Sequence, residues 1–550
     1  MKRTALLLSL LLSTTSAHAQ STALSPHDHS AHVDGAVGYV PRQVLQLPIT
    51  LRSNVGHVDD PVTTSNPEAQ AYYNQGLACL HNYVWIDAAR SFNQALRLDP
   101  QLALAHVGLF RVFINLNDLL AAAEEVRKAQ ELQTRLSDRE RRRIEVTAKH
   151  LEARQDLQNH EKHAAYKKAL DVALNSYPED VELWLLRGNA EEPAADGRGQ
   201  RGQSGSIAFY EAALAYAPDN FAAHHYLTHS FENIGRNKDA EKHGQRNAQL
   251  ANGVPHAHHM WGHDLRLVGK IDAAIEQFEI ANQLEKNWYK ADGLDPSLDW
   301  HRPHNLDLLS RSLQHEGRMK EAEQCIREAA QLRPTTAYAA YGKKMLPDFL
   351  LARGRSEEAL AAATEMQKSE WALGRLEGHV LAGRDLLALG KVEQARTQFA
   401  AAENEIPEAS KTFTGVMTLA GEELNELRGE ILLRAADKER AKDLLRTTAD
   451  TLASRRGADA LEELYLLERI ARIAREQQQW ELAQYAAALM ISFDPNYFGS
   501  HYAAALVAQH NGDAAKTQEE LATAKKLWVH ADTGLPELSQ LNATLHAEFK

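Results

Sequence analysis

The stretch that decides the fold is AQAYYNQGLACLHNYVWIDAARSFNQALRLDP, residues 69–100. Small residues stand at Gly76 and Ala88, where two antiparallel helices can approach closely, and the large Phe92 fills the space between them. Pro100 cannot continue a helix, so it ends the second one. The stretch therefore predicts a helix, a turn and a second helix packed back on the first.

The same spacing of small residues returns along most of the chain. The copies are marked by Gly235 with Ala240, Gly269 with Ala274, Gly317 with Ala322, Gly354 with Ala359, and further ones at Gly390, Gly429 and Gly512. This pattern resembles the tetratricopeptide repeat (TPR), a helix pair of about 34 residues. The resemblance implies an all-α fold, a right-handed superhelical solenoid of TPR helix pairs whose first helices line a concave groove.

The N-terminus has the pattern of an export signal. Lys2 and Arg3 precede an apolar run, and Ala17-His18-Ala19 offers a cleavage site. No Cys follows that site, so we expect a periplasmic protein without a lipid anchor, and no later apolar run is long enough for a membrane span. The predicted organisation is a signal peptide at 1–19, an extended, His-rich segment at 20–66, an N-terminal TPR array with a His-lined groove at 67–334, and a C-terminal TPR array at 335–550.

Composition narrows the possible functions. The formal net charge of -13 argues against nucleic acid as a partner, because such proteins present a basic footprint. Cys79 and Cys325 are the only cysteines and lie far apart, which speaks against a disulfide framework. The chain contains no HExxH, GxSxG, phosphate-loop or CxxC motif, so no recognised catalytic pattern points to an enzyme.

Histidines recur with the repeat period. His225 and His229 are followed 34 residues later by His259 and His263. Residues four apart lie on one face of a helix, and adjacent helices pack about 8–10 Å apart. We therefore expect the four imidazoles to converge in the groove.

Two further positions extend this set. His256 precedes His259 by three residues, and His304 is its counterpart one copy later, because an insertion of about 14 residues lengthens that step to 48. Imidazole and carboxylate ligands without a thiolate suit Zn, Cu, Ni or Fe. The predicted ligands of a transition metal ion are His225, His229, His256, His259, His263, His304 and Asp307.

Three short strings carry a closer resemblance. HYLTH (225–229), HAHHMWGH (256–263) and PHN (303–305) resemble a family of exported bacterial TPR proteins with HxxxH, HxxHMxxH and HN signatures. QAYYNQGL (70–77) and SDRERRRIE (137–145) are also similar to that family. The resemblance supports the site and implies no particular reaction. Where members carry a further His after the HN pair, this chain has Asp307.

Three functions are open on this pattern. The first is an exported TPR binding protein that holds a transition metal in a His cluster on the concave groove. The second is a TPR scaffold that binds a peptide or protein partner without metal, its histidines contacting carboxylates. The third is a metal-dependent hydrolase or oxidase in which Glu232, three residues after His229, acts as general base. An N-terminal tract with His27, Asp28, His29 and His32 could also pick up metal.

Some residues near the cluster have structural interpretations. His224 and His258 point to another helix face and are expected to pack against the neighbouring helix. Residues 193–206 predict a mobile, Gly-rich loop. The insertion between Asn287 and Pro303, with Trp288, Tyr289, Trp300 and His301, predicts either an aromatic lid or a packed spacer. Val44 to Arg52 is the only strand-like stretch, and Ser137 to Glu140 predicts a helix-capping box.

Overall fold

The computed structural model describes residues 38–192, 197–411, 414–455, 461–539 and 541. All regular elements within them are helical, and consecutive helices pack as antiparallel pairs, so the predicted all-α solenoid of helix pairs is confirmed. The strand-like stretch at Val44–Arg52 is not a strand, since its first residues belong to a short helix. The signal peptide and the tract His27–His32 lie outside the described residues.

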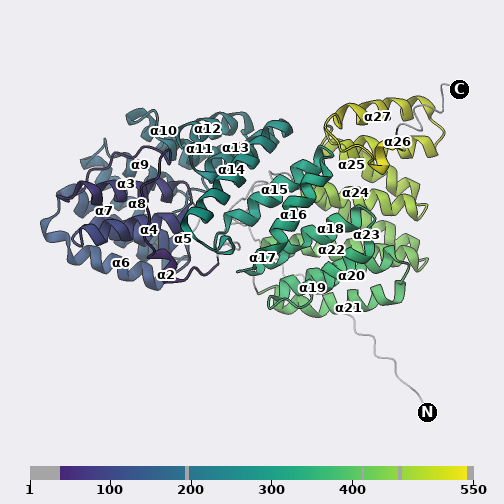
Figure 1. Ribbon diagram of the computed structural model, residues 1–550, viewed down its shortest axis with the longest axis horizontal. Helices are drawn as coiled ribbons and strands as arrows, with labels where there is room; N and C mark the ends of the chain where they lie inside the picture. Colours follow the sequence, from purple (N-terminus) through teal and green to yellow (C-terminus); the bar gives the residue numbers. More distant parts are fainter. Residues whose placement is uncertain (1–37, 193–196, 412–413, 456–460, 540, 542–550) are drawn as a thin grey trace, which may run out of the picture.

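The helices fall into two groups joined by one hairpin (Figure 1). The N-terminal group contains α2 (Arg42–Leu45), α3 (Pro67–His81), α4 (Trp85–Leu98), α5 (Ala103–Asn115), α6 (Leu119–Glu131), η1 (Gln133–Arg135), α7 (Asp138–Arg154), α8 (His160–Ser176), α9 (Val181–Asn189), α10 (Ser204–Tyr216), α11 (Phe221–Asn233), α12 (Asn237–Leu250), α13 (Pro255–Leu267) and α14 (Ile271–Asp292). The connecting hairpin is η3 (Pro296–Leu298), α15 (His301–His315) and α16 (Met319–Gln331).

The C-terminal group continues the same pairing. It contains α17 (Ala337–Tyr341), η4 (Gly342–Lys344), α18 (Met345–Ala352), α19 (Ser356–Met366), α20 (Ala372–Ala388), α21 (Val392–Ala409), α22 (Thr414–Arg434), α23 (Lys438–Ser454), α24 (Leu461–Glu476), α25 (Trp480–Phe493), α26 (Phe498–His510) and α27 (Ala514–Leu527). The boundary predicted at residue 334 falls in the connection between α16 and α17.

Close approach between helices explains the small residues of the repeat. Phe92 on α4 is fully buried between two glycines. A Cβ atom would come within 2.5 Å of its ring at Gly76 and within 2.4 Å at Gly108, distances that real side chains do not adopt. The sequence interpretation of Gly76 and Phe92 is thereby confirmed.

Helix ends also follow the sequence signals. Gly235 and Gly269 have φ of 74° and 78°, so each ends a first helix in the left-handed conformation that glycine adopts without strain. The predicted capping box is present at the start of α7. The Ser137 side chain accepts from the backbone N–H of Glu140, and the Glu140 side chain accepts from the backbone N–H of Ser137.

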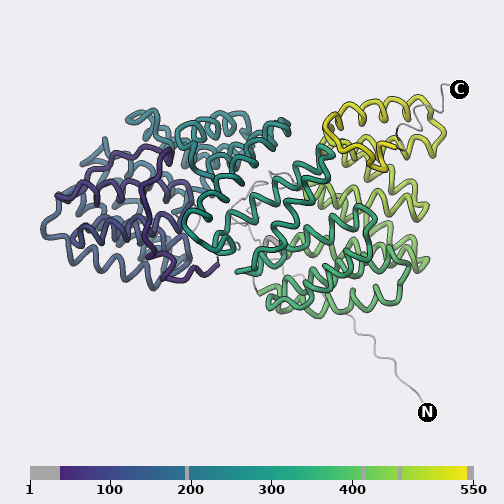
Figure 2. The backbone as a smooth tube through the Cα atoms, viewed as in Figure 1, coloured from purple at the N-terminus to yellow at the C-terminus, as the bar shows by residue number. Residues whose placement is uncertain are grey.

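The N-terminal group closes on itself (Figure 2). His81 at the end of α3 contacts the Tyr226 hydroxyl of α11 through its Nδ1 at 2.7 Å. Arg90 on α4 donates to Asp292 at the end of α14 at 2.5 Å. The first hairpin therefore packs across the inner face of helices that follow it by more than 130 residues.

The C-terminal group is closed by contacts of the same kind. Tyr465 on α24 donates to the backbone carbonyl of Arg311 on α15 at 2.7 Å, and Trp528 donates to the carbonyl of His315 at 2.9 Å. Cys79 and Cys325 are free thiols. Of the helices in the described ranges, none combines the length and the apolar character needed to cross a membrane.

Candidate metal centre

The predicted histidines gather into two groups of three. One group is His225, His229 and His256, and the other is His259, His263 and His304; within each, one nitrogen per residue lies within 4.8 Å of the others. We call them the first triad and the second triad. Each triad takes an HxxxH pair from the first helix of one pair and a single His from the first helix of the next pair, which are α11 and α13 for the first triad and α13 and α15 for the second. The second triad therefore repeats the first, one helix pair further along.

Backbone hydrogen bonding fixes the central imidazole of the first triad. Nδ1 of His225 lies 2.6 Å from the carbonyl oxygen of His81. A carbonyl oxygen only accepts, so Nδ1 carries the hydrogen and Nε2 keeps its lone pair. Metal-binding histidines are held in this way in most sites, because the hydrogen bond sets both the tautomer and the ring orientation.

The nitrogens of the first triad are spaced as metal ligands are. Nε2 of His229 and Nε2 of His256 each lie 3.1 Å from Nε2 of His225. Metal–nitrogen bonds of about 2.0–2.1 Å place tetrahedral ligands roughly 3.3 Å apart. One lone pair on His225 cannot accept well from two imidazoles at once, whereas a shared ion would accept from all three.

The second triad has a matching support. Nδ1 of His259 lies 2.9 Å from Oδ1 of Asn305, whose amide nitrogen donates to the carbonyl of Phe278 at 3.1 Å. That second bond fixes which end of the amide faces His259. Nε2 of His259 is buried and has no hydrogen-bond partner in the described part of the chain, so it is available to a ligand.

Glu232 lies between the two triads. Its side chain is fully buried, with Oε2 3.8 Å from Nδ1 of His229 and Oε1 3.9 Å from Nδ1 of His263. The carboxylate thus faces the Nδ1 side of one histidine in each triad. Burial, with the charge of Glu232, raises the pKa of Asp264 well above its ordinary range.

Burial keeps the central imidazoles neutral. Burial lowers the pKa of His225 to about 3. The hydrogen bond from His225 to the backbone carbonyl of His81 raises this pKa, but only by part of that amount. Burial, with the neighbouring His301, also lowers the pKa values of His256 and His259 well below 6.5. Neutral imidazoles with free lone pairs are the form that binds a metal ion.

The histidines do not line an open groove, which corrects the sequence prediction. Five of the six are buried, from 0% exposed at His225 and His259 to 3% at His256, and only His304 is partly accessible. The first hairpin fills the concave face at this point. Tyr83, in the turn between α3 and α4, covers the first triad, with ring centroids 4.5 Å from His225 and 5.0 Å from His256.

The loop after α9 holds that cover in place. The Tyr83 hydroxyl donates to the backbone carbonyl of Arg198 at 2.7 Å, and Arg198 is only 4% exposed. Its guanidinium in turn donates to the carbonyl of Asn115 at 3.0 Å. The sequence predicts a mobile loop at 193–206. From residue 197 on, where the structure describes it, this segment is instead packed, because the side chain and the backbone of Arg198 are buried and hydrogen-bonded.

The insertion before α15 contributes to the site in two ways. Trp300 is buried, stacks on Trp85 with centroids 5.4 Å apart and lies over His304 at 6.2 Å. The packed-spacer interpretation describes it better than an open lid. His301, which the sequence reasoning did not count as a ligand, lies between the triads with its centroid 5.0 Å from His256 and 4.5 Å from His259.

His301 has the features of a further ligand. Its Nδ1 lies 2.5 Å from Oε1 of Glu285, and its Nε2 is buried without a hydrogen-bond partner among the described residues. The earlier copies carry Gly253 and Asp219 at the position of His301, which is why the recurrence of histidines missed it. A signal was available, since His301 precedes His304 by three residues and so shares its side of the helix.

Asp307 belongs to neither triad among the described residues. Its carboxylate accepts from Nε of Arg311 at 2.6 Å, on the same helix. Asp307 and Arg311 occupy in α15 the places that His259 and His263 hold in α13. A fixed guanidinium therefore stands where a third pair of histidines would be.

His224 and His258 are structural, as predicted. Nδ1 of His224 contacts Nδ1 of His243 at 2.8 Å, and Nδ1 of His258 contacts Oε1 of Gln277 at 2.8 Å, in each case 19 residues along on the second helix of the pair. The same spacing joins His501 to Glu520. These histidines tie the two helices of a pair together.

A comparison with models of known protein families gives no match, and a comparison with curated proteins gives none either. Among solved structures, the chain is similar to the apo form of the quorum sensor NprR from B. thuringiensis (12% identity, 71% of this chain and 98% of that one, TM-score 0.42). It is also similar to yeast Tom70 (14%, 88% and 96%, 0.31) and to a human IFIT1 dimer with PPP-AAAA (11%, 82% and 94%, 0.39). At TM-scores below 0.5, nothing about partners or activity carries over to this chain.

Proposed function

We propose that this chain is a helical-repeat binding protein that holds two transition metal ions, one in each triad. The observation that carries the proposal is the convergence of three imidazole nitrogens within 4.8 Å at two equivalent places. Imidazole-only sites suit Zn, Cu, Ni or Fe. Each triad supplies three protein ligands and His301 can complete only one of them, so at least one ion keeps an open coordination position, as in sites that exchange or use their ion.

The repeat geometry supports two separate ions. The triads are related by one helix-pair step, and adjacent helices lie about 8–10 Å apart. Ions that share one bridging oxygen lie about 3.5–4 Å apart. We therefore propose two mononuclear sites, although the rings of His256 and His259, one from each triad, stack with centroids 5.8 Å apart.

The other two functions fit this geometry less well. Histidines that contact the carboxylates of a peptide need an open face, and five of the six are buried. A scaffold role remains compatible with the rest of the TPR-like surface. Glu232 faces the Nδ1 side of His229 and His263, at 3.8 and 3.9 Å, rather than the Nε2 side of His229, where a general base would meet a metal-bound water.

Elemental analysis of the untagged, chelator-free protein tests the proposal. We expect close to two equivalents of metal in the parent, one in His225→Ala/His229→Ala and one in His259→Ala/His263→Ala. His379→Ala, in α20 and outside both triads, is the control and should keep two. Absence of metal from the parent after reconstitution, or two equivalents in a variant that lacks both HxxxH pairs, would overturn it.

A further inference from the structure

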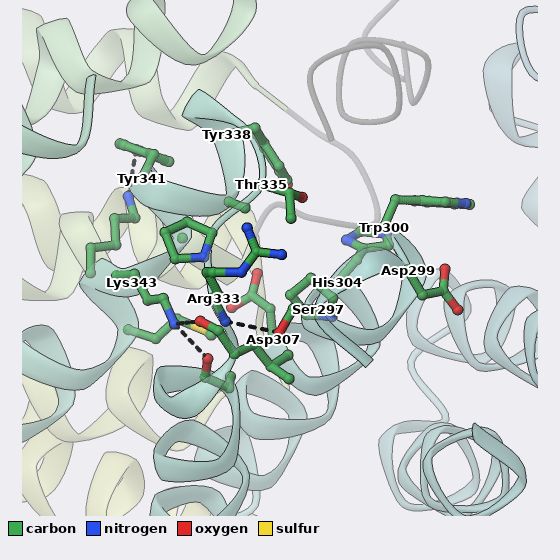
Figure 3. Close-up of a pocket in the computed structure, with 18 of the residues that line it drawn as sticks. Ser297, Asp299, Trp300, His304, Asp307, Arg333, Thr335, Tyr338, Tyr341 and Lys343 are labelled. Atoms are coloured by element: carbon green, nitrogen blue, oxygen red, sulfur yellow. Dashed lines mark hydrogen bonds between the residues drawn. The ribbon is translucent and has the colours of Figure 1, made fainter. Parts of the chain in front are cut away.

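A cavity lies at the junction of the two helix groups (Figure 3). Its walls come from η3, α15, the end of α16, α17 and η4. His304, the one triad member that is partly accessible, forms part of its lining beside Trp300. The cavity therefore connects the second triad with the outside, while the first triad stays covered by Tyr83.

One side of the cavity is apolar and aromatic. Trp300, Pro303, Leu332, Pro334 and Tyr338 contribute flat or aliphatic surface. Apolar walls with a few convergent polar groups are the usual lining of binding sites for small organic molecules. A planar ring fits such a wall better than an extended peptide does.

Most charges in the lining are neutralised by neighbours. Arg311 is paired with Asp307 at 2.6 Å and with Glu462 at 3.3 Å. Lys344 is paired with Glu423 at 2.9 Å and also with Glu462. These groups contribute little net field to the cavity.

Two cations remain with weaker compensation. Lys343 donates to the backbone carbonyls of Ala329 and Ala330 at 3.0 and 2.9 Å and to that of Leu332, so its three N–H groups are used and it contributes only its charge to the cavity. Arg333 approaches Asp295 only at 3.8 Å, with its side chain 65% exposed. Both side chains line the cavity with the aromatic wall and His304. The electrostatic preference is for an anion.

We propose that this cavity binds a small aromatic carboxylate within reach of an ion held at His304. The ring packs on the wall around Trp300 and Tyr338, and the carboxylate is held by Arg333, with the positive charge of Lys343 on the same cavity wall. This inference rests on the proposed function only for the contact with metal. The binding pocket itself stands on its own lining.

Isothermal titration calorimetry with benzoate, on the full-length metal-free protein, tests the pocket. We expect saturable binding, weakened about threefold to tenfold in Arg333→Gln and lost in Ala339→Phe, which fills the cavity without removing a contact. Arg236→Gln, an exposed arginine immediately before α12, is the matched control and should bind as the parent does. Benzamide, of the same shape without the charge, should bind more weakly than benzoate.

Cobalt absorption tests the connection to the second triad. Benzoate added to the Co²⁺-loaded protein should change the visible absorption of the ion, and Ala339→Phe with an unchanged melting temperature should abolish that change. Equal binding by Ala339→Phe and the parent, or by benzamide and benzoate, overturns the pocket. Binding with no change in the cobalt spectrum overturns the contact with the triad, and failure to load cobalt bears on the proposed function alone.

Discussion

Oδ1 of Asn305 and Nδ1 of His259 lie 2.9 Å apart, which orients a buried histidine of α13 through an amide of α15. In the first triad the same task is done by the backbone carbonyl of His81, at 2.6 Å from Nδ1 of His225. Two unlike groups thus hold equivalent imidazoles in the same tautomer. The support of the second triad is a side chain, so mutation can remove it.

Asn305→Leu should weaken metal binding at the second triad by about 10–100-fold, because the Nδ1–H of His259 loses its acceptor. Asn305→Asp, which keeps an acceptor, should restore most of the affinity. Competition with a chromophoric chelator measures both, and the first triad serves as an internal reference. Equal loss at both triads would show that Asn305 acts on the fold rather than on His259.

Tyr83→Asn should speed the release of metal from the first triad by at least tenfold, because the ring that covers His225 and His256 is removed. Asn tolerates the left-handed backbone at this position, where φ is 57°, so the turn is kept. Tyr83→Phe keeps the ring and loses only the hydroxyl's bond to Arg198, so it should release metal more slowly than Tyr83→Asn. Stopped-flow transfer to a chelator gives the rates; identical release from Tyr83→Asn and the parent would refute the covering role.

His315 should stabilise the C-terminal closure in a pH-dependent way. Its Nε2 lies 3.0 Å from Asp494, and its Nδ1 lies 3.4 Å from Glu316. Burial alone would lower the pKa of His315, but the bonds to Asp494 and Glu316 outweigh it and raise the pKa above 6.5. The stabilisation is therefore fully present below pH 6.5 and is lost as pH rises through the folded-state pKa.

The free energies of unfolding of the parent and of His315→Gln, compared at pH 6 and pH 9, test this prediction. The difference between the two free energies should be larger at pH 6, by about 1.4 kcal/mol for each unit by which the pKa is raised. A difference independent of pH would mean that His315 contributes packing only.

Gly108→Ala should destabilise the N-terminal group by about 1–3 kcal/mol, because its Cβ would lie 2.4 Å from the buried ring of Phe92. Gly421→Ala, inside α22 with no atom within 4 Å of the new Cβ, is the matched control. It should be neutral or slightly stabilising, since alanine favours a helix over glycine. Chemical denaturation gives the free energy of unfolding of both variants. Similar values for the two would contradict the close approach at Gly108.

The helix pairs could be predicted from the sequence because their determinants are local. Gly76, Phe92 and Pro100 act within one repeat, and a period of 34 residues extends the argument along the chain. The pairing of His225 with His229, and of His259 with His263, follows from the same register.

The covering of the triads could not be predicted, because it depends on contacts distant in sequence. The carbonyl of His81 contacts His225, which lies 144 residues later in the sequence. The repeat pattern does not predict that the first hairpin (α3 and α4) packs against the fifth (α11 and α12). The same closure converts an expected groove into a buried site. His301 was missed for another reason, since the equivalent positions of the earlier copies are Gly253 and Asp219 and carry no histidine.

The Asp307–Arg311 pair has a consequence for loading capacity. In α15 it replaces the two histidines that α11 and α13 supply, and its guanidinium already provides a positive charge at that level of the stack. On the proposed function, the number of metal ions bound by one chain equals the number of helix pairs that carry an HxxxH pair. The series of sites ends at α15, where Asp307 and Arg311 replace the two histidines. Duplicating the unit that contains His259 and His263 would raise the capacity in whole steps, with no change to the chemistry of any single site.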